Sequence, residues 1–289
     1  MITRSGRAFD GSVLAAADGW EAGGVALAVV DTDGLVAVHG PLDAPRPWAS
    51  VSKLLTASLV LVATEHGLVA LDEPAGPPGA TIRHLLAHAS GLAFDDPSVI
   101  APPGRSRIYS NAGFDILASV TAARAGRPFP DLLREWVLDP LGMTGTSLVD
   151  RPSQGLVGPM TDLAAFAFEL LRPGVLPATV LAAATTVAFP GLRGLLPGIG
   201  RFDPLDWGLG FELRDGKAPH WTGTGNSPGT FGHFGASGAF LWVDPAAGLA
   251  LACLPERPFG PWALAAWPAM SDAVLAAAGQ VGARVAGAG

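Results

Sequence analysis

Strand-like segments near both ends of the chain enclose a long helical middle, and this order constrains the fold more than any other feature. Two apolar runs rich in β-branched residues, 23–30 and 34–39, flank the turn-forming stretch from Asp31 to Gly34, which predicts a β-hairpin. Further strand-like runs follow late in the chain, at 209–213, 239–243 and 249–254. We therefore expect one antiparallel sheet built from both termini, with the middle inserted between them and a ligand-binding cleft where the two parts meet.

The middle of the chain has helical periodicity that Gly and Pro residues interrupt. The first predicted helix ends at Gly67, and Ser50 stands at or next to its N-cap. The helices predicted are 51–66, 82–88, 114–125, 129–138, 162–171, 178–186 and, near the end of the chain, 262–279.

Composition excludes several classes of function. The 289 residues are 49% apolar, enough for a large core, whereas only 15% are charged and the net charge is −7. A chain this acidic has no basic surface for a phosphate backbone, so we expect no nucleic-acid partner. No apolar stretch approaches the roughly 20 residues of a membrane span, so we expect no membrane partner. The first residues lack the apolar core of a secretory signal, which predicts a cytoplasmic protein. The sequence does not indicate an oligomeric state.

One pair of residues suggests nucleophilic catalysis. Ser50 and Lys53 are three residues apart, so a helix places the hydroxyl and the amine on one face. A serine hydroxyl needs a base to become a good nucleophile, and a lysine serves if burial lowers its pKa. Ser52 is adjacent to Lys53 and points elsewhere, which favours Ser50 as the nucleophile.

A second motif is rarer. Tyr109 is the only tyrosine of the chain, and Asn111, two residues later, is one of two asparagines. Each motif alone has a structural interpretation: Ser50 as a helix N-cap, or Tyr109 and Asn111 as turn residues after the Pro-Pro-Gly stretch at 102–104. Their joint occurrence favours a catalytic site.

Two other patterns are rejected as sites. His84 and His88 stand four residues apart on a predicted helix, but no third metal ligand is evident, so we interpret them as structural and expect no metal or other cofactor. Ser227 lies in a Gly-x-Ser-x-Gly pattern, but Pro228 lacks the backbone NH that such an oxyanion hole requires.

With these motifs the sequence resembles the serine β-lactamase and penicillin-binding-protein superfamily, and within it the class C β-lactamases and their related esterases. Segments 81–92, 137–143 and 208–211 also match stretches familiar in that family, and the third family motif corresponds to His233-Phe234-Gly235. The resemblance covers most of the chain. It implies an α+β, β-lactamase-like two-lobe fold in a single domain over 1–289. A five-stranded antiparallel sheet flanked by helices would form an α/β lobe from about 1–45 and 205–289, with an inserted all-helical lobe over about 46–204.

The resemblance also implies roles for individual residues. Tyr109 would move protons with Lys53 between Ser50 and the leaving group, and Asn111 would bind the acyl side of the substrate. The NH groups of Ser50 and Ala236 would hold the oxyanion, with Gly235 permitting close approach of the strand edge.

The histidine of the third motif bears on the substrate. His233 would line the pocket opposite Lys53. Relatives with a lysine there carry a fixed positive charge suited to a substrate carboxylate, whereas a histidine is mostly neutral at pH 7.

The leading hypothesis is a serine hydrolase that forms a covalent acyl-enzyme on Ser50 and acts as a carboxylesterase or amidase on small substrates. The alternative within enzymes is a β-lactamase or D-alanyl-D-alanine carboxypeptidase, so the partner is a small ester, amide or lactam. A third hypothesis, of another class, is a non-catalytic ligand-binding protein on the same scaffold.

Overall fold

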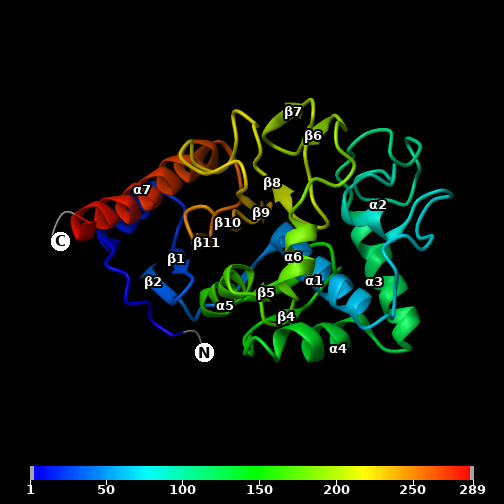
Figure 1. Cartoon of the computed structure of the whole chain (residues 1–289), viewed down its shortest axis with the longest axis horizontal. Coiled ribbons are helices and arrows are strands. Elements are labelled where there is room, and N and C mark those ends of the chain that lie inside the picture. The colour runs from blue at the N-terminus through cyan, green and yellow to red at the C-terminus, as the bar shows by residue number, and fades with distance from the viewer. Residues whose placement is uncertain (1–2, 287–289) are drawn as a thin grey trace.

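The computed structural model describes residues 3–286 of the chain (Figure 1). The helices are η1 (Gly11–Trp20), η2 (Ala49–Val51), α1 (Ser52–Glu65), α2 (Ile82–Leu86), α3 (Asn111–Ala125), α4 (Phe129–Leu133), the π-helical turn η3 (Arg134–Leu138), α5 (Met160–Leu171), α6 (Ala178–Ala184) and α7 (Pro261–Ala286). The strands are β1 (Val25–Asp31), β2 (Gly34–His39), β3 (Arg46–Pro47), β4 (Ser147–Leu148), β5 (Leu156–Gly158), β6 (Gly194–Leu196), β7 (Gly200–Phe202), β8 (Glu212–Leu213), β9 (Phe231–Phe234), β10 (Phe240–Asp244) and β11 (Leu249–Pro255).

The central sheet joins the two ends of the chain, as the sequence predicts. Its order is β2-β1-β11-β10-β9-β8, and every neighbouring pair is antiparallel. β1 lies between β2 and β11, with Val25 opposite Pro255 and Asp31 opposite Leu249. The expectation of five strands is wrong in one respect: among the described residues the sheet has six, because β9 pairs between β8 and β10 in a stretch outside the five strand-like runs. Of the predicted strand 209–213, only Glu212 and Leu213 join the ladder.

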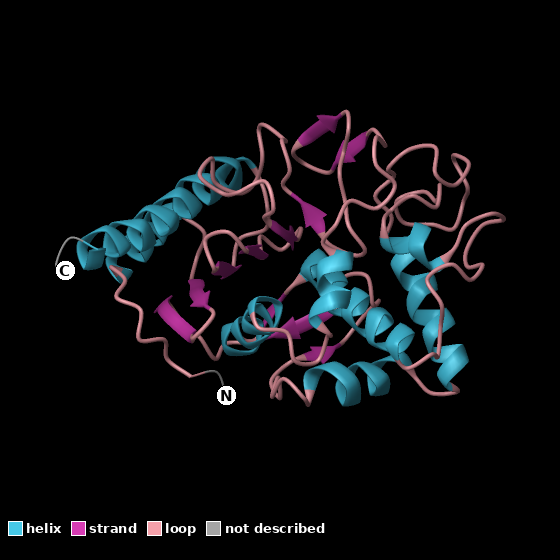
Figure 2. Cartoon of the chain, viewed as in Figure 1, coloured by secondary structure: helices cyan, strands magenta, loops and turns pink. Residues whose placement is uncertain are grey.

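Helices cover both faces of this sheet, so its inner strands are buried on both sides (Figure 2). Alternate residues of a strand point to opposite faces. Leu27 and Val29 belong to one cluster with α7, whereas Ala28 and Val30 belong to a second cluster with α5. This explains why β1 and β11 are nearly continuous apolar runs without alternating polar residues.

The inserted middle surrounds α1, which is buried on nearly all sides. Twelve of its 14 residues are buried, since α3, α4 and the strand β9 contact it from different directions. The expectation that the insertion is all-helical is wrong, because it also holds the small sheet β3-β5-β4 and the hairpin β6-β7. These strands have only two or three residues each, too short for the alternation that sequence analysis detects.

The architecture is therefore α+β, as predicted. The boundaries of the two lobes stay a prediction. Within residues 3–286, no helix combines the length and the apolar character needed to cross a bilayer.

Candidate active site

Ser50 lies in the turn η2, directly before α1, where its side chain is partly exposed. Two hydrogen bonds anchor this turn through buried Trp48, whose indole NH donates to the Gly158 carbonyl (3.1 Å) and whose backbone NH donates to the Leu156 carbonyl (2.9 Å). The Ser50 hydroxyl caps neither η2 nor α1, and the N-cap position of α1 belongs to Val51. The interpretation of Ser50 as a simple N-cap is thus not what the geometry shows.

Lys53 is completely buried in the first turn of α1, and its amine lies 3.3 Å from the Ser50 hydroxyl oxygen. The amine also donates to Asn111 Oδ1 at 2.6 Å and to the Ser153 carbonyl at 2.8 Å. Two acceptors therefore hold two hydrogens of the amine. When the amine is neutral, its lone pair is left for the third direction, which is that of Ser50.

Burial lowers the pKa of Lys53 from 10.5 to about 7, because desolvation disfavours the ammonium form. The carboxylate of Asp115 opposes this change, and the Arg151 guanidinium adds to it. A large fraction of Lys53 is therefore neutral at pH 7, which an exposed lysine would not be.

Tyr109 lies next to Ser50 and contacts His233. The phenol oxygen lies 3.3 Å from His233 Nε2, and His233 Nδ1 lies 2.6 Å from the Phe234 carbonyl. A carbonyl only accepts, so Nδ1 carries the imidazole proton and Nε2 accepts from the Tyr109 hydroxyl. Burial, with a smaller effect of Lys53, lowers the His233 pKa to about 3, so the ring is neutral at pH 7.

The phenol of Tyr109 is a weak acid in this setting. Burial raises its pKa well above the ordinary value, and a hydrogen bond from Ser50 opposes only part of that rise. The ring face lies over the Lys53 amine, with 4.8 Å between the nitrogen and the ring centroid. Tyr109 therefore stays protonated in the free protein.

Asn111, the first residue of α3, has both ends of its amide occupied. Its oxygen accepts from Lys53, and its nitrogen donates to Asp95 at 3.1 Å. The side chain is buried, so its predicted hydrogen bond to substrate stays a prediction. What the geometry shows is a fixed acceptor for the Lys53 amine.

Sequence reasoning missed the polar groups behind Lys53. Asp115 accepts from the Ser153 NH at 3.1 Å and pairs with Arg151 at 2.6 Å, which holds the Ser153 carbonyl against the amine. Asp115 lies four residues after Asn111 on α3, so the shared helix face was a usable signal. No motif marks the Ser153 carbonyl, because a backbone acceptor depends only on the path of the chain.

The backbone directly after β9 approaches Ser50 closely at Gly235. A side-chain carbon there would lie 2.6 Å from the Trp48 carbonyl and 2.9 Å from the Ser50 nitrogen. Within the described part of the chain, neither the Ser50 NH nor the Ala236 NH donates a hydrogen bond. Both NH groups are therefore available where the resemblance predicts an oxyanion hole.

Replacing Gly235 by alanine is expected to lower the rate of Ser50 acylation about 100-fold, because the strand edge must move away from η2. The free energy of unfolding should fall by about 1–3 kcal/mol through overpacking. Stopped-flow acylation and urea unfolding measure the two effects. Gly216→Ala is the control, since a methyl group there meets no atom within 4 Å. Acylation at the wild-type rate in Gly235→Ala would contradict the close approach.

The residues rejected as sites have structural contacts. His88 is buried beneath Tyr109, with ring centroids 4.5 Å apart, and its Nδ1 accepts from the Ser110 NH at 3.1 Å. His84 pairs with Thr81 at 2.9 Å. Ser227 donates to Asp244 at 2.7 Å, so its hydroxyl is engaged in that loop.

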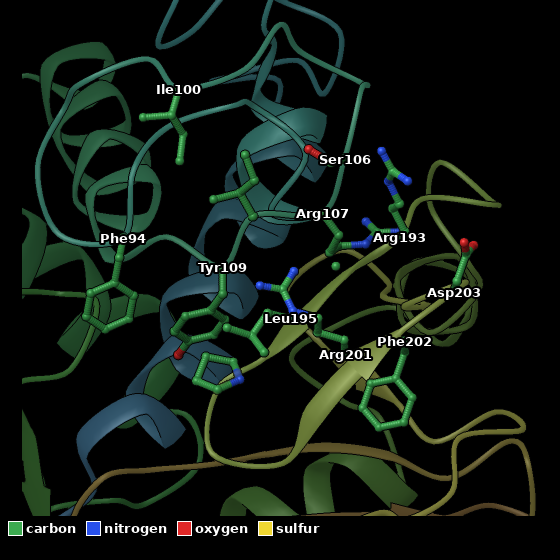
Figure 3. A pocket seen from close by; sticks show the side chains of 13 residues that line it. Phe94, Ile100, Ser106, Arg107, Tyr109, Arg193, Leu195, Arg201, Phe202 and Asp203 are labelled. Carbon is green, nitrogen blue, oxygen red and sulfur yellow. The ribbon is translucent and has the colours of Figure 1, made fainter.

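A cavity of about 810 Å³ opens beside Tyr109 (Figure 3). The loop that carries Phe94 and Ile100 forms one side, and the β6-β7 hairpin forms the other. Phe94 stacks on Tyr109 with 5.9 Å between ring centroids. Tyr109 is thus shared between the Ser50 cluster and this cavity.

Comparisons with known proteins show the family and the fold of the chain. The Beta-lactamase family model matches residues 15–274. A solved structure described as a β-lactamase (Mb2281c) from Mycobacterium bovis is 51% identical, covers 92% of this chain and 99% of its own, and superposes with a TM-score of 0.91.

More distant proteins share parts of the sequence or the fold. The D-alanyl-D-alanine-carboxypeptidase/endopeptidase AmpH of Escherichia coli is 29% identical over 154 residues, so the match spans only 40% of this chain and 40% of that protein. EstCE1, a hydrolase with promiscuous acyltransferase activity, is 17% identical with a TM-score of 0.74 over 91% of this chain and 97% of its own, a likeness of fold. With the family model matching nearly the whole chain, the protein belongs to the Beta-lactamase family of serine hydrolases.

Proposed function

We propose that the protein hydrolyses small carboxylic esters through a covalent acyl-enzyme on Ser50. The observation that carries this proposal is the Lys53 amine, which is buried, has a pKa of about 7, and has two of its three directions occupied by acceptors. The remaining direction meets the Ser50 hydroxyl at 3.3 Å. A lysine in this state is a general base for the serine.

In acylation, Ser50 Oγ attacks the ester carbonyl while its proton passes to the neutral Lys53 amine. The NH groups of Ser50 and Ala236 stabilise the oxyanion. Collapse of the tetrahedral intermediate breaks the bond to the alcohol, which takes a proton from Tyr109. Lys53 returns a proton to Tyr109, since the phenol remains the weaker acid. In deacylation, water attacks the acyl carbon while its proton passes to the neutral Lys53 amine, and Lys53 returns that proton to Ser50 Oγ as the bond between Oγ and the acyl carbon breaks.

His233 acts through Tyr109 in this scheme. Because its protonated nitrogen faces the Phe234 carbonyl, the other nitrogen presents a lone pair that orients the Tyr109 hydroxyl. We therefore propose a positioning role for His233, and its predicted contact with substrate stays open to test.

The neutral state of His233 favours esters over acidic lactams. A substrate carboxylate next to Ser50 would face an uncharged imidazole, which offers no ionic attraction. Lactam or peptide acylation is the second candidate, favoured by the description of the 51% identical structure as a β-lactamase.

One experiment tests both candidates. The wild-type protein is incubated with p-nitrophenyl butyrate and with a chromogenic cephalosporin, turnover is recorded, and intact-mass and peptide mapping locate the adduct. We expect an acyl group on Ser50 and a larger kcat/KM for the ester. A larger value for the cephalosporin would establish the second candidate, and no adduct with either compound would contradict both.

The pH dependence gives a further prediction. Since the neutral amine is the base, kcat/KM for the ester should rise with pH around a midpoint near 7. Asp115 raises the Lys53 pKa, so Asp115→Asn should move the midpoint to lower pH. Asp131→Asn, which removes an exposed carboxylate of α4, is the matched control. A midpoint that does not move in Asp115→Asn would refute the assignment of this titration to Lys53.

A further inference from the structure

The cavity beside Tyr109 is lined by apolar side chains that are exposed to water, which is unfavourable for apolar surface. Phe94, Ile100 and Leu195 are 52%, 62% and 48% exposed and are three of the six large apolar side chains most exposed in the described chain. All three line this one cavity, together with Phe202. Contiguous exposed apolar surface of this kind marks a binding site.

The walls of the cavity are held by buried polar contacts. The Arg107 NH donates to the Arg193 carbonyl at 2.9 Å, which attaches β6 to the segment leading to Tyr109. The Arg107 guanidinium is itself buried and donates to the carbonyls of Ala87, Ala188, Phe189 and Leu205. The hairpin is therefore fixed beside Tyr109, and the cavity is largely preformed.

Positive charge lies at the rim of this apolar cavity. Arg193 and Arg201 are exposed, and neither forms an ion pair with a described carboxylate. Asp203 is the one carboxylate among the lining residues. Of the three lining arginines, Arg107 is engaged by backbone carbonyls, which leaves the guanidinium groups of Arg193 and Arg201 against that one negative charge. In Figure 3 the Arg201 side chain extends into the cavity in the direction of Tyr109.

We propose that this cavity binds an apolar segment ending in an anionic group, so that the preferred substrates are amphiphilic esters whose carboxylate or similar anion reaches Arg193 and Arg201. This inference rests on the proposed function. The apolar walls remove the chain of the substrate from water, and the arginines pair with its end.

The test compares matched esters with and without a terminal carboxylate. In one arm the charge is on the acyl half: mono-p-nitrophenyl adipate against p-nitrophenyl hexanoate. In the other arm it is on the alcohol half: 6-acetoxyhexanoic acid against hexyl acetate, followed by pH-stat titration. The readout is the ratio of kcat/KM for the anionic ester to kcat/KM for the neutral one.

We expect the anionic ester to be preferred in one arm, which identifies the half that occupies the cavity. Arg193→Gln and Arg201→Gln should each lower that ratio about two- to fivefold and the double variant about tenfold, the range of exposed ion pairs. Arg105→Gln is the control, because it removes an exposed positive charge from the same loop region without lining the cavity. The preference should also weaken at 0.5 M salt.

A ratio at or below one in both arms, or a ratio that the double variant leaves unchanged, would overturn the inference. Mass detection of the Ser50 adduct with neutral p-nitrophenyl hexanoate separates this failure from that of the proposed function. An adduct without charge preference refutes only the cavity assignment, whereas no adduct with any ester refutes the proposed function.

Discussion

Ser50→Ala is expected to lose ester hydrolysis by a factor on the order of 10⁴ or more and to form no acyl adduct. The effect is this large because the hydroxyl is the proposed attacking group and no other described hydroxyl lies beside both the Lys53 amine and the free NH groups of η2 and residue 236. Turnover of p-nitrophenyl butyrate and intact mass after incubation measure both losses.

Ser52→Ala is the matched control for this prediction. The Ser52 hydroxyl is buried and accepts the Leu156 NH at 2.9 Å, so its removal leaves a buried donor unpaired. We expect the free energy of unfolding to fall by about 1–3 kcal/mol while the adduct still forms on Ser50. If Ser50→Ala kept the adduct and Ser52→Ala lost it, the choice of nucleophile would be wrong.

Lys53→Met is the second change with a large expected effect, a fall in kcat/KM on the order of 10³ to 10⁴. Methionine approximates the length and volume of the lysine stem but has no amine to accept the Ser50 proton. Activity that remains should lose the rise with pH near 7, because the titrating group is gone. Retention of that rise in Lys53→Met would show that another group titrates.

The same variant tests the burial of Lys53 through stability. The pKa is 10.5 in the unfolded chain and about 7 in the folded one, so between these pH values the unfolded chain binds a proton that the folded chain has released. The contribution of Lys53 should therefore raise the free energy of unfolding of the wild type as the pH rises from 7 to about 10. Urea unfolding across this range should show a smaller rise in Lys53→Met. Parallel curves for the two proteins would refute the lowered pKa.

Much of the fold follows from periodicity and turn residues. The hairpin of β1 and β2, the late strands β10 and β11, and the long helices agree with the sequence prediction because each has enough residues to repeat its pattern. β8 keeps only two residues of its predicted run, and neither the four-residue strand β9 nor the short strands of the middle have enough residues for such a repeat. The prediction of an all-helical insertion failed there for that reason.

The candidate site also has a part that the sequence could predict and a part that it could not. Ser50, Lys53, Tyr109 and Asn111 could be selected because side-chain chemistry and spacing mark them, and the structure brings them together. The partners that fix the Lys53 amine could not all be selected. The Ser153 carbonyl belongs to a loop whose path depends on the pairing of Arg151 with Asp115, a contact between distant segments.

The interleaving of the two chain ends in the central sheet has a consequence for synthesis on the ribosome. β1 and β2 emerge early, but a two-stranded hairpin alone is marginally stable, and β1 gains its second partner only when β11 has been made. The backbone at Gly235 follows β9, which joins β1 through β10 and β11, so it is placed against η2 only after β11 has been made. A nascent chain therefore carries Ser50 and Lys53 well before Gly235 can be placed against η2, so the proposed oxyanion hole forms only after β11 has been made.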